Sequence, residues 1–100
     1  MQEYKYLKDA LGEFSSTLEF SMDEYLSEFK SMVEMSPEYA KNVRLEILSA
    51  LSDPNWSWVD EAEDSEFIGA DDSADGVWET VAELIWCVVA PDEEVPNIKV

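Results

Sequence analysis

The side chains that could do chemistry in this chain are mainly carboxylates, because its 100 residues include 24 Asp and Glu, one Cys and no His. Histidine is the usual general base and the usual partner of a Ser or Cys nucleophile, so the common routes to covalent catalysis are missing. Cys87 has Trp86, Val88 and Glu83 as neighbours, and none of them would stabilise its thiolate. Paired carboxylates can cleave glycosidic bonds, but acids this abundant form pairs by chance. We therefore expect no enzyme activity and no catalytic residue.

One segment, residues 71–82, is similar to the start of a calcium-binding EF-hand loop. Its first, third and fifth positions carry oxygen ligands and its sixth carries the glycine of the turn: Asp71, Ser73, Asp75 and Gly76. The twelfth position, which needs a bidentate Glu, is Ala82. A weak calcium module is one interpretation. We prefer an acidic loop that caps the following helix, and we expect neither a metal nor a cofactor.

The carboxylates are unevenly distributed along the chain. Between Arg44 and Lys99 there are 15 acids and no base, whereas residues 1–44 carry nine acids and five bases. Like charges this close destabilise a compact domain through self-repulsion. A solvated surface that gives solubility is the alternative, but such surfaces mix Lys with Glu, as residues 1–44 do. The one-sided charge favours a binding face for a basic partner.

The densest part of this acidic segment, residues 56–76, supplies the partner-binding residues that we expect. A tryptophan beside the acids is the expected anchor, because Trp is enriched at binding hot spots. Of Trp56 and Trp58, one would anchor the partner and the other would close the end of the fold. The predicted partner-binding residues are Trp58, Asp60, Glu61, Glu63, Asp64, Glu66, Asp71, Asp72 and Asp75.

The overall charge restricts the class of partner. A net charge of -18 repels nucleic acid and anionic membranes, because both are bound through Lys and Arg. The longest apolar run, residues 84–90, is too short to cross a bilayer. With one Cys and no secretory signal pattern, the chain is predicted to be soluble and cytoplasmic.

Capping residues and apolar periodicity predict the helices that position the acids. Ser21 and Glu24 form a predicted capping box. Ser36 followed by Pro37 is a second helix start. Elsewhere apolar side chains recur every three or four residues, as on one face of a helix. The predicted helices cover residues 3–18, 22–34, 37–51 and 74–89.

Residues 53–73 are predicted to be an acidic connection before the last helix, in which residues 58–66 could form one or two turns. Ser73 or Asp75 would cap that last helix. Its end, residues 84–89, is apolar nearly all round, so a buried strand is an alternative. We prefer a helix because no second strand is available to pair with it.

The predicted fold class is therefore all-α, a small bundle of about four helices. One domain is expected over residues 1–90, since 100 residues are enough for a single core. Pro91 ends the last helix, and residues 91–100 are predicted to be a flexible acidic tail.

Size, charge and helix order together resemble the bacterial immunity proteins, which neutralise nuclease toxins of the contact-dependent growth inhibition and colicin types. The resemblance is carried by the two capped helix starts, by E-I-L-S-A-L-S at 46–52 and by V-W-E-T-V-A-E-L at 77–84. It implies a cytoplasmic inhibitor that binds one toxin domain as a monomer and covers its substrate-binding or active site. The alternative is a nucleic-acid mimic of the anti-restriction or anti-CRISPR type, which would block a DNA-binding enzyme. A mimic would spread its acids along a face, whereas here they cluster in one segment.

Overall fold

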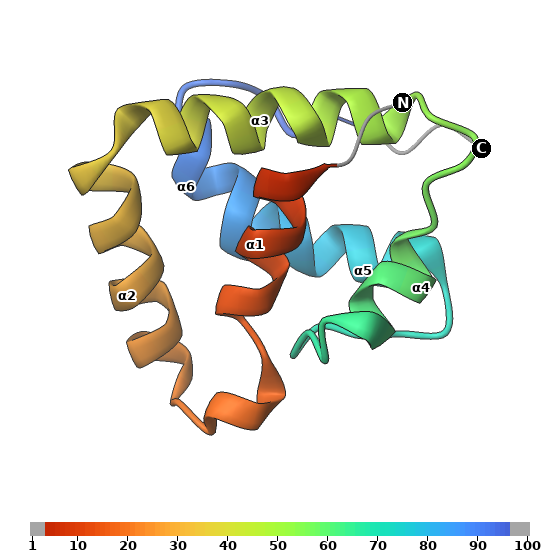
Figure 1. Cartoon of the computed structure of the whole chain (residues 1–100), viewed down its shortest axis with the longest axis horizontal. Helices are drawn as coiled ribbons and strands as arrows, with labels where there is room; N and C mark the ends of the chain where they lie inside the picture. Colours follow the sequence, from red (N-terminus) through yellow and green to blue (C-terminus); the bar gives the residue numbers. More distant parts are fainter. Residues whose placement is uncertain (1–3, 97–100) are drawn as a thin grey trace.

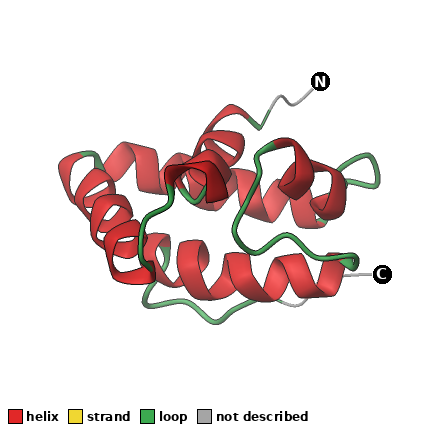
Figure 2. Ribbon diagram, turned by 90° about the horizontal axis from the view of Figure 1, so that it is seen from below, coloured by secondary structure: helices red, strands yellow, loops and turns green. Residues whose placement is uncertain are grey.

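The computed structural model describes residues 4–96 and shows an all-α fold, as the sequence predicts (Figures 1 and 2). The described residues contain no strand, only an isolated antiparallel bridge between Ser15 and Phe67. α5 continues through a π-helical turn, Ala82–Trp86, directly into α6. The helices are α1 (Lys5–Glu13), α2 (Met22–Met35), α3 (Pro37–Leu51), α4 (Trp58–Asp64), α5 (Ala74–Val81) and α6 (Cys87–Val89).

Both helix starts that the sequence marks most clearly are confirmed. The Ser21 hydroxyl accepts a hydrogen bond from the Glu24 amide at 3.2 Å, and the Glu24 carboxylate accepts one from the Ser21 amide at 3.1 Å. At α3 the Ser36 hydroxyl accepts from the Tyr39 amide at 3.3 Å, and Pro37 occupies the first helical position. These caps satisfy amides that have no partner inside the helix.

The first helix is shorter than predicted. α1 ends at Glu13, and a separate 3₁₀ turn covers Ser16–Leu18. Between them the backbone pairs with the loop after α4: the Ile68 amide donates to the Phe14 carbonyl at 2.8 Å, and the Ser16 amide donates to the Glu66 carbonyl at 2.7 Å. This long-range pairing takes backbone groups that a continuing helix would need. The predicted start at residue 3 lies outside the described residues.

Residues 84–89 are helical, as the sequence predicts, so the alternative of a buried strand is wrong. Glu83 and Cys87 are exposed, but the rest of this stretch is largely enclosed, since α6 packs against both α2 and α3 and α5 packs against α4. Three consecutive side chains, those of Leu84, Ile85 and Trp86, are buried as a result. The indole N–H of Trp86 is buried without a hydrogen-bond partner.

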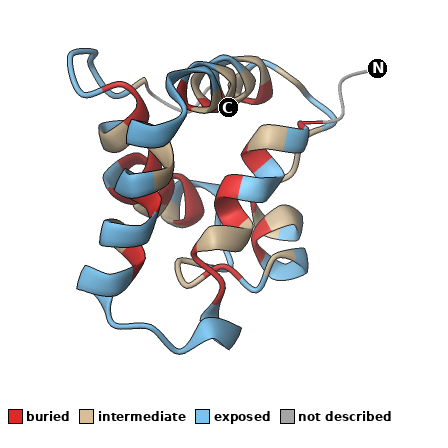
Figure 3. Cartoon of the chain, turned by 60° about the vertical axis from the view of Figure 1, so that its left-hand side comes forward, coloured by how far each residue is buried: buried red, intermediate tan, exposed pale blue. Residues whose placement is uncertain are grey.

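The buried residues form one continuous core, and Figure 3 shows them in red along the helices. Aromatic rings fill two parts of this core. Around Phe14, ring centroids lie 5.2 Å away in Phe29, 5.8 Å away in Tyr25 and 6.4 Å away in Phe67. The second part is a row of rings in which neighbouring centroids are 4.8, 5.3 and 5.3 Å apart. Its members, in order, are Tyr4, Trp56, Trp58 and Trp78.

Residues 91–96, which fall in the segment predicted to be a flexible tail, contact the helices at two points. The guanidinium of Arg44 on α3 donates two hydrogen bonds to the Glu93 carboxylate, one of them at 2.8 Å. The Trp78 indole N–H donates to the Pro96 carbonyl at 3.0 Å. Residues 97–100 of that segment lie outside the described residues.

Two glycines provide a matched test of this packing. A Cβ added to Gly12 in α1 would meet nothing within 4 Å, whereas one added to Gly69 would overlap the Thr80 side chain and lie 2.8 Å from the Phe67 ring. Gly12→Ala should therefore stabilise the fold by about 1 kcal/mol, as expected in a helix. Gly69→Ala should destabilise it by about 1–3 kcal/mol through overpacking. Urea unfolding measures both, and equal stability of the two variants would contradict the close packing of the loop on α5.

Candidate partner-binding face

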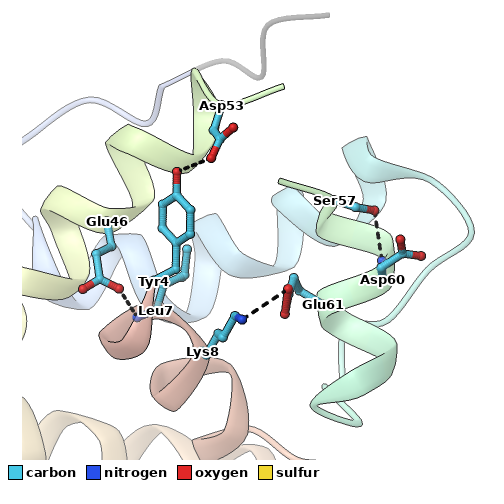
Figure 4. Close-up of polar contacts among 8 residues, drawn as sticks. All are labelled: Tyr4, Leu7, Lys8, Glu46, Asp53, Ser57, Asp60 and Glu61. Carbon is cyan, nitrogen blue, oxygen red and sulfur yellow. Dashed lines mark hydrogen bonds and ion pairs between the residues drawn. The ribbon is translucent and has the colours of Figure 1, made fainter. Parts of the chain in front are cut away.

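α4 carries the first part of the acidic segment and orients it by its helical period. Ser57 caps the helix, since its hydroxyl accepts a hydrogen bond from the Asp60 amide at 3.2 Å (Figure 4). Trp58 and Ala62, four residues apart, are buried on the inner side. The carboxylates of this short helix therefore lie on its outer and lateral sides.

The eight acids predicted for the face remain almost entirely free of basic partners. Glu61 is half-buried, and its carboxylate lies 3.8 Å from the ammonium nitrogen of Lys8 on α1 (Figure 4). In the part of the chain that the structure describes, this is the one ion pair made by the eight. The other seven are exposed: Asp60, Glu63, Asp64, Glu66, Asp71, Asp72 and Asp75. We define these eight acids as the acidic face.

The loop before α5 has the geometry of a helix cap. The Ser73 hydroxyl accepts a hydrogen bond from the Gly76 amide at 3.1 Å, and the Asp71 carboxylate accepts one from the Ser73 amide at 3.3 Å. Asp75 lies in the first turn of α5, where a negative charge favours the positive end of the helix. Over residues 4–96 no group of three or more Asp, Glu or Cys side chains is arranged to hold a metal ion.

Trp58 does not fit the predicted role of interface anchor. It is 4% exposed, and its ring lies between those of Trp56 and Trp78. The cause is its position four residues before Ala62 on the inner side of α4, which places the ring in the core. A groove beside Pro54 is lined by both tryptophans, and Trp56 is only half-buried. It is the tryptophan of this pair that keeps some accessible surface.

Two further acids of the segment stabilise the fold instead of joining the face. Tyr4 occupies the N-cap position of α1, but its side chain provides no cap. Glu46 of α3 instead accepts a hydrogen bond from the Leu7 amide at 2.9 Å (Figure 4). Asp53 accepts from the Tyr4 hydroxyl at 2.6 Å and from the Asn55 amide at 2.9 Å. These hydrogen bonds, that from Tyr4 first, lower the pKa of Asp53.

A comparison of the chain with protein-family models, with curated proteins and with solved structures finds no match. Over residues 4–96 no helix combines the length and the apolar character needed to cross a membrane.

Proposed function

We propose that the chain is an acidic protein-binding inhibitor of the immunity-protein type, which neutralises a basic nuclease toxin by covering its substrate-binding or active site. The observation that supports it most directly is the state of the acidic face. Four of its eight carboxylates lie on α4, three on the loop that follows and one in the first turn of α5, and among the described residues only Glu61 has a basic partner. A surface that retains so much uncompensated charge is complementary to the Lys and Arg that a nuclease uses to hold RNA or DNA.

The inhibitor would act by stoichiometric binding and would need no chemistry of its own. Long-range attraction between the net charge of -18 and a basic partner raises the association rate above the ~10⁵–10⁶ M⁻¹s⁻¹ typical of uncharged pairs. Once bound, carboxylates at the centre of the contact would be desolvated against Arg or Lys. Those at the rim would mainly steer the encounter and make it dependent on salt.

The test is a set of single charge-neutral substitutions on the acidic face, measured against the nuclease that co-purifies with the tagged chain from its native host. One or two central acids should dominate, each costing about 2–5 kcal/mol of binding when replaced by its amide, because the partner's cation is left buried and unpaired. Glu61→Gln should have a small effect, since Lys8 already compensates its charge. The substitutions are Asp60→Asn, Glu61→Gln, Asp64→Asn, Glu66→Gln, Asp71→Asn and Asp72→Asn.

Glu34→Gln is the matched control, because it removes the same charge from the C-terminal end of α2, on the other side of the molecule from α4 (Figure 1). It should leave the dissociation rate unchanged. The purified chain should also block the nuclease at a one-to-one ratio. If all six substitutions weaken binding equally and duplex DNA competes for the same site on the partner, the nucleic-acid mimic replaces this proposal. If none of them matters, the acidic face is a solubility surface.

A further inference from the structure

A second surface of unusual composition lies beside the acidic face, in the turn that leads into α2. Leu18, Phe20 and Met22 are 43%, 39% and 49% exposed. They are three of the seven large apolar side chains exposed over residues 4–96, yet they fall within five consecutive positions. We call these three residues the 18–22 patch. Apolar side chains gathered on a surface in this way mark interaction sites more often than isolated ones do.

Phe20, the central residue of the 18–22 patch, packs against the start of α2. The ring of Phe20 packs edge-on against Tyr25, with centroids 5.4 Å apart. The Tyr25 hydroxyl in turn donates a hydrogen bond to the Ser15 carbonyl at 2.6 Å, which ties α2 to the preceding turn. This contact is the hydrophobic staple of α2 and uses one side of the Phe20 ring. It does not require Leu18 or Met22 to be apolar, so the staple alone leaves the patch unexplained.

Carboxylates line a groove that begins at Phe20, the central residue of the 18–22 patch. This open groove of about 260 Å³ runs from Phe20 along the first turns of α2, and Asp23, Glu24 and Glu28 line it with Ser27. The groove is smaller and more open than the ~300–1,000 Å³ cavities that take small ligands, and its size suits a single side chain of a protein partner. Residues 18–28 contain no base, and the first one along the helix is Lys30.

The residues that directly precede the 18–22 patch contact the chain at Glu66 of the acidic face. The Ser16 amide donates to the Glu66 carbonyl at 2.7 Å, and Ser15 and Phe67 form an antiparallel bridge. Figure 1 shows the turn before α2 beside the loop that follows α4. A partner lying over the end of the acidic face near Glu66 would therefore reach the patch as well.

We infer that the 18–22 patch binds an apolar side chain on a basic protein segment, whose flanking Lys or Arg pair with Asp23, Glu24 and Glu28. The inference rests on the proposed function in taking a basic protein as the partner. Charge selects this occupant: an anionic membrane and a second copy of this chain would both be repelled by the acids around the patch and by the net charge of -18. An apolar centre inside a charged border is also the usual arrangement of a binding hot spot.

The experiment titrates the isotope-labelled chain with two synthetic 12-residue peptides and follows its backbone amide signals by NMR. One peptide contains only Lys and Leu, and in the other every Leu is replaced by Ser. The Lys/Leu peptide should shift the signals of residues 18–28 and bind at least tenfold more tightly than the Lys/Ser peptide. Met22→Ser should remove most of that difference. Met35→Ser is the matched control, because Met35 lies at the other end of α2 and is 86% exposed.

The outcomes separate this inference from the proposed function. If shifts are confined to residues 58–75 and both Met22→Ser and Phe20→Ser bind like the unmodified chain, the inference is wrong while the acidic face stands. If Met22→Ser loses the Lys/Leu preference but amide substitutions on the acidic face change neither peptide's affinity, the inference holds and the proposed face is wrong. A dimer that Met22→Ser dissociates, measured by sedimentation, would overturn the inference. Melting curves of each variant confirm that it is folded.

Discussion

Phe14→Ala is expected to lower the free energy of unfolding by about 3–5 kcal/mol, the cost of removing a large buried aromatic side chain. Phe14 is fully buried, and its ring contacts Tyr25 and Phe29 of α2 and Phe67 of the loop after α4. Its loss therefore leaves a cavity where three parts of the chain meet. Against a typical domain stability of about 5–15 kcal/mol, the variant should be close to unfolding at 37 °C.

Urea unfolding followed by far-UV circular dichroism measures this change. Leu48→Ala on α3 is the control, because Leu48 is exposed and surface substitutions usually stay within about 0.5 kcal/mol. A cost below about 1 kcal/mol for Phe14→Ala would show that the region around this ring is not closely packed. The contacts between the turn before α2 and the loop after α4 would then also be in doubt, since Phe14 lies between them.

Stability is expected to fall steeply above pH 10, because two tyrosine hydroxyls keep their protons more firmly in the fold than in the unfolded chain. Burial, followed by the hydrogen bond to Asp53, raises the pKa of Tyr4 to about 12. Burial, followed by the 2.8 Å hydrogen bond to Asp9, also raises the pKa of Tyr39. A raised pKa contributes stability that is complete below the unfolded value near 10 and is lost as the pH rises through the folded value.

Unfolding by urea at pH 8, 10 and 11.5 tests the expectation. Lys side chains also lose their charge in this range and add to the net negative charge, so substitutions are needed to isolate the tyrosines. The double variant Tyr4→Phe, Tyr39→Phe should lose less stability between pH 8 and 11.5 than the unmodified chain does. Tyr6→Phe is the control, because within residues 4–96 the Tyr6 hydroxyl makes no hydrogen bond, and its curve should match the original. Equal slopes for all three proteins would contradict the prediction.

The parts of the fold that the sequence predicts well are those fixed by neighbouring residues. The starts of α2 and α3 are correct because their caps, Ser21 and Ser36, bond to amides three residues away. The predicted end of α1 is wrong because the helix is ended by backbone pairing with residues 66–68. These residues lie so far along the chain that the sequence does not indicate the pairing. The capping role of Glu46 cannot be predicted for the same reason, since Glu46 bonds to an amide 39 positions away. The one available signal was the lack of a capping side chain before α1.

In the candidate site, too, the features set by neighbouring residues are predicted and those set by the fold are not. Exposure of the acids follows from their charge and from the period of α4, so their sequence pattern alone was enough to place them on the surface. Which tryptophan enters the core depends on where Ser57 starts the helix, and that sets Trp58 in phase with Ala62. The 18–22 patch is not apparent from the sequence, because an apolar residue directly before a helix cap, such as Phe20, is already explained by a hydrophobic staple. Its second role depends on the exposure of Leu18 and Met22, which no local pattern gives.

The separation of core residues and exposed acids on opposite sides of α4 has an evolutionary consequence. Trp58 and Ala62 hold this helix to the core, while the acids Asp60, Glu63 and Asp64 between and after them are exposed. Substitutions at those outer positions touch no core contact, and changes of this kind usually alter stability by less than about 0.5 kcal/mol. Under the proposed function, in which these charges help to decide which partner is recognised, a lineage carrying this fold can exchange them one at a time without passing through unfolded intermediates.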